Sequence, residues 1–173
     1  MENHRIWIIG VSCSGKSTLA KEISEKLNIP MIEPDDIQWL PGWKMMDADE
    51  FYDKIDELTE QDNWIITGNH LPTFRLLWSK ANIIIWLDYP FYIILWRALL
   101  RTFKRCLFKQ KCCGENYETF WRALNPNESI LVWVLKTYFL RKKHFSILFD
   151  RYKNSNKTLI RIKEVHFDIF ACF

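Results

Sequence analysis

Nine consecutive residues near the N-terminus have the types and spacing needed to hold a phosphate chain. They are Gly10, Val11, Ser12, Cys13, Ser14, Gly15, Lys16, Ser17 and Thr18, and the first eight match G-x-x-x-x-G-K-[ST]. The glycines let backbone N–H groups turn toward a β-phosphate, and a helix that begins near Gly15 directs its positive end at the same anion. Lys16 can reach the β- and γ-phosphates, and the Ser17 hydroxyl can ligate Mg²⁺. These residues are the predicted binding site for ATP and Mg²⁺.

The segments on either side of this motif are those that such a loop requires. Residues 6–9 form a short apolar run typical of a buried strand, and residues 17–27 repeat apolar positions at helical spacing. A simple Gly/Ser turn in an unrelated α/β protein is the alternative, but it leaves Lys16 and Ser17 without a role. The sequence therefore predicts strand, phosphate loop and helix in that order.

Further along the chain, strand-length apolar runs alternate with helical periodicity. The predicted strands are 6–9, 31–32, 64–66, 83–87 and 158–162. The predicted helices are 16–27, 47–62, 73–80, 90–108 and 128–152, with a last turn from residue 164. This alternation is typical of a parallel sheet covered by helices on both faces, an α/β fold.

Composition predicts one cytoplasmic domain. The 173 residues are 49% hydrophobic, and the net charge of +3 is too small to indicate a nucleic-acid or membrane partner without a local patch. No charged and apolar leader precedes Ile6, and the apolar stretch 83–100 divides better into a strand and a helix than into a membrane span. Five cysteines without a C-x-x-C pair indicate a reducing compartment.

Polar residues follow each of the predicted core strands. Asp35 and Asp36 come after the second, residues 67–70 after the third and Asp88 after the fourth. Because ligands of open α/β sheets bind beyond the carboxyl ends of the strands, these residues should gather on one edge with the phosphate loop. Asp88 has two interpretations, ligation of a Mg²⁺-bound water or a place at the N-terminus of the next helix.

Taken together, these segments resemble the topology-modulation (FlaR-related) P-loop proteins, which are similar to adenylate-kinase-type small-molecule kinases. The resemblance covers residues 5–170 and includes Asp-x-x-x-Trp at 35–39, Pro-Gly-Trp at 41–43, Gly-Asn at 68–69 and Trp-Leu-Asp-Tyr-Pro at 86–90. It implies a three-layer P-loop fold with a five-stranded parallel sheet in the order 2-3-1-4-5, ATP binding, and a helical lid over about residues 97–125. It also implies an acceptor site that includes Gly68 and Asn69.

Two positions depart from that family pattern. Thr67 stands where an acidic residue usually helps to hold Mg²⁺, which leaves a catalytically weak kinase homologue as an alternative. His70 replaces a more usual Tyr, and it either binds a substrate oxygen or lies on the surface.

Several side chains beyond the loop are candidates for chemistry. Asp35 is positioned to orient or deprotonate an acceptor hydroxyl, although a turn or helix cap is its structural alternative, with Asp36 as its substitute. Trp39, Trp43 and less directly Trp64 offer flat surfaces for a base or sugar ring, or they anchor the loop. The predicted catalytic residues are Lys16, Asp35, Arg97 and Arg101.

Arg97 and Arg101 begin a cationic face that continues with Lys104 and Arg105. Fixed guanidinium groups stabilise the charge of a transferring phosphoryl group, so this face predicts a kinase lid, with a solvated helix surface as the alternative. The predicted function is ATP-dependent phosphoryl transfer to a nucleoside-like or other small acceptor. A nucleic-acid-binding regulatory module that uses basic residues such as those at 141–143 is the alternative of a different class.

Overall fold

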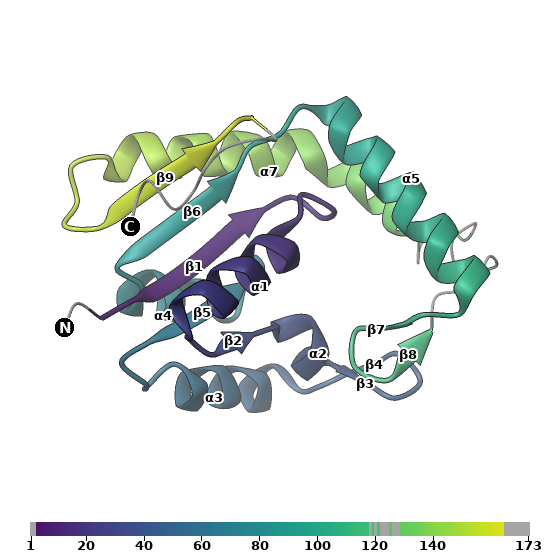
Figure 1. Ribbon diagram of the computed structural model, residues 1–173, viewed down its shortest axis with the longest axis horizontal. Helices are drawn as coiled ribbons and strands as arrows, with labels where there is room; N and C mark the ends of the chain where they lie inside the picture. The colour runs from purple at the N-terminus through teal and green to yellow at the C-terminus, as the bar shows by residue number, and fades with distance from the viewer. Residues whose placement is uncertain (1–2, 118, 120, 122–124, 126–128, 165–173) are drawn as a thin grey trace.

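A computed structural model describes residues 3–117, 119, 121, 125 and 129–164, and it is centred on a parallel sheet (Figure 1). The sheet strands are β1 (Arg5–Gly10), β2 (Met31–Ile32), β5 (Trp64–Thr67), β6 (Ile83–Leu87) and β9 (Thr158–Ile162). They lie in the order β2-β5-β1-β6-β9, and each neighbouring pair runs parallel. Counted along the chain this is the order 2-3-1-4-5, so the predicted sheet is confirmed.

The predicted helices form, with small changes at their ends. The helices are α1 (Lys16–Leu27), α2 (Pro34–Gln38), α3 (Ala48–Leu58), α4 (Phe74–Lys80), α5 (Phe91–Phe108) and α7 (Ile130–Tyr152). Helix α3 ends at Leu58, before residue 62, and Thr59 is its C-cap residue. The Thr59 hydroxyl donates to the carbonyl oxygens of Ile55 and Asp56. The turn predicted from residue 164 falls largely outside the described residues. None of the described helices is both long and apolar enough to cross a bilayer.

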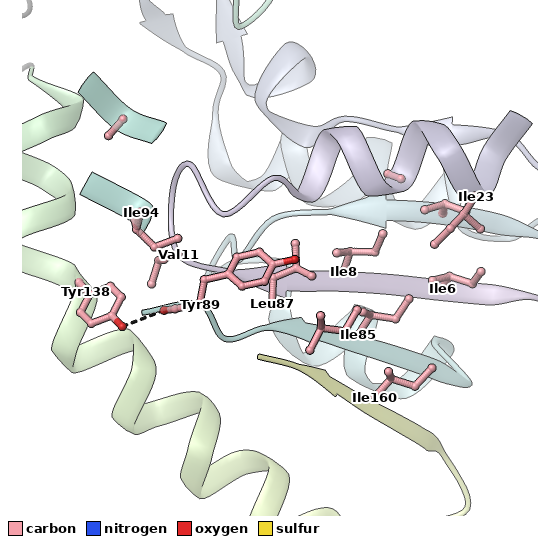
Figure 2. Packing of buried hydrophobic residues seen from close by; sticks show 14 of the residues in the cluster. Ile6, Ile8, Val11, Ile23, Ile85, Leu87, Tyr89, Ile94, Tyr138 and Ile160 are labelled. Carbon is pink, nitrogen blue, oxygen red and sulfur yellow. Dashed lines mark hydrogen bonds between the residues drawn. The ribbon is translucent and has the colours of Figure 1, made fainter. Parts of the chain in front are cut away.

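Alternating side chains of the sheet supply two hydrophobic cores. Ile6 and Ile8 face a core that includes residues of α1, α5 and the first half of α7. Trp7 and Ile9 face the other way, into a core with α3, α4 and the second half of α7. Figure 2 shows the first core, where the Tyr138 hydroxyl of α7 donates to the backbone oxygen of Tyr89 at 2.9 Å. Burial on both faces explains the continuous apolar character of these strands.

Two short hairpins and helix α2 are absent from the prediction. The hairpins pair β3 (Trp39–Leu40) with β4 (Lys44–Met45) and β7 (Lys111–Cys112) with β8 (Asn116–Tyr117). Asn116 joins them, since its Nδ2 donates to the Leu40 oxygen at 3.0 Å and its Oδ1 accepts from the Trp43 N–H at 2.9 Å. Within the described part of the predicted lid region, α5 ends at Phe108 and is followed by the β7–β8 hairpin, which contacts the hairpin that follows α2.

Candidate active site

The phosphate loop leaves the carboxyl end of β1 and leads into α1. Gly10 has φ 154°, and a Cβ there would lie 2.7 Å from Ser14 Oγ and 3.0 Å from the Leu87 backbone oxygen. Gly15, the N-cap of α1, has φ 95°. Only glycine fits both positions without strain, so the two motif glycines are required by the shape of the loop.

The N-terminus of α1 is suited to an external anion. No side chain caps it, and its first turn contains no acidic residue. The helix dipole and the N–H groups of the first turn therefore have no carboxylate of their own turn to interact with. Ser17 and Thr18, both exposed, lie at this end. The donors present fit the phosphates of ATP, and the Ser17 hydroxyl fits one ligand position of Mg²⁺.

Lys16 folds back over its own loop. Its Nζ donates to the backbone oxygens of Gly10 at 3.1 Å and Val11 at 3.0 Å. Burial lowers the pKa of this ammonium to about 8, an effect that the nearby Asp35 carboxylate partly opposes and that Arg101 and Arg141 reinforce. Lys16 is thus a desolvated cation next to the N-terminus of α1, the position from which it can neutralise phosphate charge.

We expect ATP affinity to fall as pH rises above about 8, because Lys16 then loses the proton that makes it a phosphate ligand. The loss of ATP affinity approaches about tenfold per pH unit, since Lys16 must take up one proton when ATP binds. Titration of ATP between neutral and alkaline pH measures it. A Lys16→Arg variant that still binds should give a flat profile, and an equally flat wild-type profile would contradict the assignment.

Asp35 and His70 form a pair at the tip of β2. Asp35 is in the first turn of α2, and its Oδ1 lies 3.3 Å from His70 Nε2. Although burial alone would raise it, the pKa of Asp35 is lowered by the hydrogen bond and charge of His70 and by Lys16 and Arg101. The His70 side chain is only 14% exposed and packs edge-on against Phe51. The prediction of a surface His70 was therefore wrong.

Arg97 contacts the phosphate loop, and Arg101 lies near it. Arg97 Nη1 donates to the Ser14 backbone oxygen at 2.9 Å, and its guanidinium lies 4.8 Å from the centre of the Tyr89 ring. The charge of Arg101 affects the pKa of both Lys16 and Asp35, so it lies near them. Among the described residues the buried Nε of Arg101 has no acceptor. A half-buried arginine with an unused, buried Nε donor near a phosphate loop fits an anionic ligand.

Arg141 is a site residue that sequence reasoning missed. It lies half-buried on α7, and burial lowers its pKa while the Asp35 carboxylate raises it. Its guanidinium packs over Trp133 at 5.5 Å. In the sequence it belongs to the basic run 141–143, where nothing distinguishes it from its neighbours. Helical geometry separates them, because Lys142 turns to Asp88 and Lys143 is exposed.

Gly68 and Asn69, predicted to contact the acceptor, are engaged with β1. The Asn69 Nδ2 donates to the Gly10 oxygen at 2.6 Å, and its Oδ1 accepts from the Gly10 N–H at 3.3 Å. The Gly68 oxygen accepts from Trp7 Nε1 at 2.9 Å. In this arrangement the Gly-Asn pair positions the start of the phosphate loop.

The three tryptophans considered for the acceptor site have different surroundings. Trp39 and Trp43 meet edge to face at 5.6 Å in the first hairpin, and Trp43 Nε1 donates to the Tyr117 oxygen at 3.3 Å. Trp64 is completely buried, with its Nε1 donating to the Thr59 oxygen at 3.1 Å. The suggestion that Trp64 offers a binding surface was therefore wrong, since it is a core residue of β5.

Asp88 stabilises the fold and does not cap α5. This buried carboxylate lies 3.0 Å from Lys142 Nζ and 2.7 Å from Arg161 Nη2, and α5 has no side-chain cap. Arg161 also lies over the Trp86 ring at 4.2 Å. The pairs join β6 to α7 and β9, so they align the elements behind the site. Neither sequence interpretation of Asp88 included these two partners, because both are distant in the sequence.

Asp88→Asn should lower the free energy of unfolding by about 3 kcal/mol, because two partly buried cations lose their counter-charge. Denaturant unfolding measures the change. Asp62→Asn is the matched control, as Asp62 is exposed and pairs with Arg5 at 3.5 Å, and it should cost less than about 1 kcal/mol. Equal effects of the two substitutions would show that the ion pairs of Asp88 contribute no more to the free energy of unfolding than the exposed pair of Asp62.

Comparison with known proteins places this site in a familiar architecture. In sequence, the chain matches no known family profile and no curated protein. In structure it is similar to a gluconokinase from Sinorhizobium meliloti 1021, at TM-score 0.53 and 18% identity, over 94% of this chain and 85% of that one. The chain shares the fold of this gluconokinase, with a P-loop and a five-stranded parallel sheet. A shikimate kinase from Bacteroides thetaiotaomicron matches at TM-score 0.49 and 18% identity, over 83% of this chain and 82% of its own.

Proposed function

We propose that this P-loop protein is a kinase that transfers the γ-phosphoryl group of ATP to a small acceptor. One observation carries the proposal: four cationic side chains from three helices gather around the phosphate loop and Asp35. They are Lys16, Arg97, Arg101 and Arg141. Phosphoryl transfer depends mainly on positioning and on neutralising spread negative charge, and fixed cations supply both.

The residues have separate roles in this proposal. Residues 10–18 bind the phosphates, and Lys16 neutralises the β- and γ-phosphates. Mg²⁺ held by the Ser17 hydroxyl would supply further neutralisation of the phosphate chain. Asp35, kept ionised by its cationic surroundings, orients the acceptor hydroxyl and accepts its proton. Arg97 and Arg101 act from the lid, which we assign to about residues 97–125 of a single domain, and Arg141 acts from α7.

We place the acceptor between Asp35 and the two joined hairpins. Trp39 and Trp43 supply flat apolar surface there, which suits a nucleoside-like ring or another small metabolite. We also propose that the chain is one of the topology-modulation proteins and that it carries out adenylate-kinase-like chemistry in the cytoplasm. The sequence blocks and the 2-3-1-4-5 sheet support this family assignment.

Incubation of the protein with ATP, Mg²⁺ and extracted metabolite pools tests the proposal. We expect a phosphorylated product that forms only with ATP and disappears with the Asp35→Asn variant. Thermal stabilisation by ATP without any product would favour the weak homologue suggested by Thr67. Absence of both stabilisation and product would overturn the kinase proposal.

A nucleic-acid-binding module remains the alternative of a different class. Its support in the sequence was the set of basic groups interleaved with aromatic residues, but two of these cations have other roles here. Lys142 contacts Asp88, and Arg141 lies near Asp35. Affinity for polynucleotides that falls steeply with salt would favour this alternative.

A further inference from the structure

Helix α5 carries a continuous exposed apolar stripe. Its members recur at helical spacing and are Tyr92, Trp96, Leu99, Leu100, Phe103 and Leu107. Tyr92 is 70% exposed, Trp96 62% and Phe103 58%. Figure 1 shows α5 running along the outside of the molecule from the strand tips to the β7–β8 hairpin. Single exposed apolar residues are ordinary, but a stripe of this length marks a surface that binds something.

A second exposed stripe lies on α7, where apolar and basic residues alternate. Trp133, Leu140 and Ile147 are exposed along one side of α7, with the exposed Lys136 and Lys143 between them. The two helices meet where Phe91 stacks on the exposed Phe139 at 5.7 Å. We call the exposed residues of both helices the α5–α7 face. It combines aromatic and aliphatic side chains with long, flexible cations.

Charge is divided unequally between this part of the chain and the rest. Residues 91–153 contain thirteen Lys and Arg against four Asp and Glu, a net +9, whereas the other residues contain eleven against seventeen, a net −6. Helix α5 itself has four basic residues and no acidic one. The total of +3 conceals this division, which is why the sequence predicted no membrane partner.

The charge decides between occupants of the face. A second copy of the chain would bring together two surfaces on which exposed lysines, among them Lys104, Lys136 and Lys143, exceed the acidic residues, which opposes association. A polynucleotide would pair with the lysines but would leave Leu140, Ile147 and Leu107 against a polar backbone. An anionic bilayer satisfies both features, because aromatic and aliphatic side chains enter the boundary of headgroups and acyl chains while lysines reach the lipid phosphates.

We propose that the α5–α7 face binds the surface of membranes that contain anionic lipids. The helices lie on the bilayer and do not cross it, in agreement with the lack of a spanning helix among the described residues. Arg97 points from another side of α5 to the phosphate loop, so the site and the membrane surface use different faces of the same helix. This proposal is independent of kinase activity.

Sedimentation of the full chain with vesicles tests it, in the absence of ATP. We expect binding to vesicles of phosphatidylcholine and phosphatidylglycerol at least about tenfold tighter than to phosphatidylcholine alone. Tryptophan fluorescence should shift to the blue on binding, and brominated lipids should quench it, because Trp96 enters the interface. Part of the binding should survive added salt, since apolar insertion is not screened.

Two sets of substitutions distinguish the contribution of apolar insertion to vesicle binding from that of electrostatic attraction. The Trp96→Glu/Phe103→Glu double variant should bind the anionic vesicles at least about tenfold more weakly. Tyr52→Glu on α3 is the matched control and should bind as the wild type does. Lys136→Glu/Lys143→Glu should remove the preference for anionic lipid, with Lys44→Glu as its control. Thermal unfolding of each variant confirms that these exposed substitutions leave the fold intact.

Three results would overturn the proposal. One is equal, weak binding to both kinds of vesicle by the wild type. Another is a dimer in sedimentation equilibrium that Trp96→Glu/Phe103→Glu dissociates, which would assign the face to a second copy. The third is polynucleotide binding that the same variant abolishes. Loss of kinase activity would not affect any of these measurements, so the two proposals fail separately.

Discussion

Lys16→Ala should abolish thermal stabilisation by ATP while the protein remains folded. At about one hundred times its dissociation constant, ATP stabilises the wild type by about 2.7 kcal/mol, or roughly 5–10 °C in a domain of this size. The variant should show almost none of this shift, because the desolvated ammonium beside Gly10 and Val11 is gone. Turnover should fall by about 10²–10³ or more, as for loss of a major electrostatic contact. Differential scanning fluorimetry and a coupled kinase assay measure the two effects.

Lys21→Ala is the matched control for this experiment. Lys21 lies further along α1, is exposed, and makes one surface ion pair with Glu25 at 3.8 Å. Its removal should change neither ATP stabilisation nor turnover appreciably. If Lys16→Ala kept the full thermal shift, the loop would not be a nucleotide site and the proposed function would lose its basis.

Asp35→Asn should lower kcat by about 10²–10⁴ with ATP stabilisation preserved. The amide keeps the size of the carboxylate, but it cannot accept the acceptor's proton. Because the pKa of Asp35 is lowered by His70, Lys16 and Arg101, wild-type activity should not decline at mildly acid pH through protonation of this group. Steady-state kinetics with the identified acceptor, together with ATP thermal shifts, separate transfer from binding.

Asp36→Asn distinguishes the two neighbouring carboxylates. Asp36 Oδ1 accepts from the Gly114 N–H at 2.8 Å, so it connects α2 to the lid hairpin and has no contact with His70 among those described. We expect this variant to raise KM more than it lowers kcat, within about tenfold. If it removed turnover and Asp35→Asn did not, the acceptor carboxylate would be Asp36.

The sequence predicted the sheet and the phosphate loop well because both depend on local patterns. Residues 83–87 and 158–162 are strands with the predicted bounds, and α1 covers 16–27 as expected. Short apolar runs buried on both faces and helical periodicity are readable over a few residues. The loop is equally local, since its glycines, lysine and serine act within one turn of chain.

Other features depend on partners far away in the sequence. The β3–β4 and β7–β8 hairpins have strands of two residues, too short to leave a periodic signal, and Asn116 joins them across more than seventy residues. His70 looked like a surface residue until the fold placed it against Phe51 and Asp35. In each case the deciding contact joins elements that only the folded chain brings together.

The sequence by itself determined the strands, the phosphate loop, and Lys16 and Asp35 as candidates for chemistry, while the family resemblance implied the strand order. Tertiary structure alone decided which cations join them: Arg141 turns toward Asp35, while its neighbour Lys142 turns to Asp88. The physical reason is that a loop motif carries its geometry in adjacent residues, whereas a helix projects successive side chains about 100° apart. Which of those directions faces the site is set by the packing of α7 against the sheet and α5.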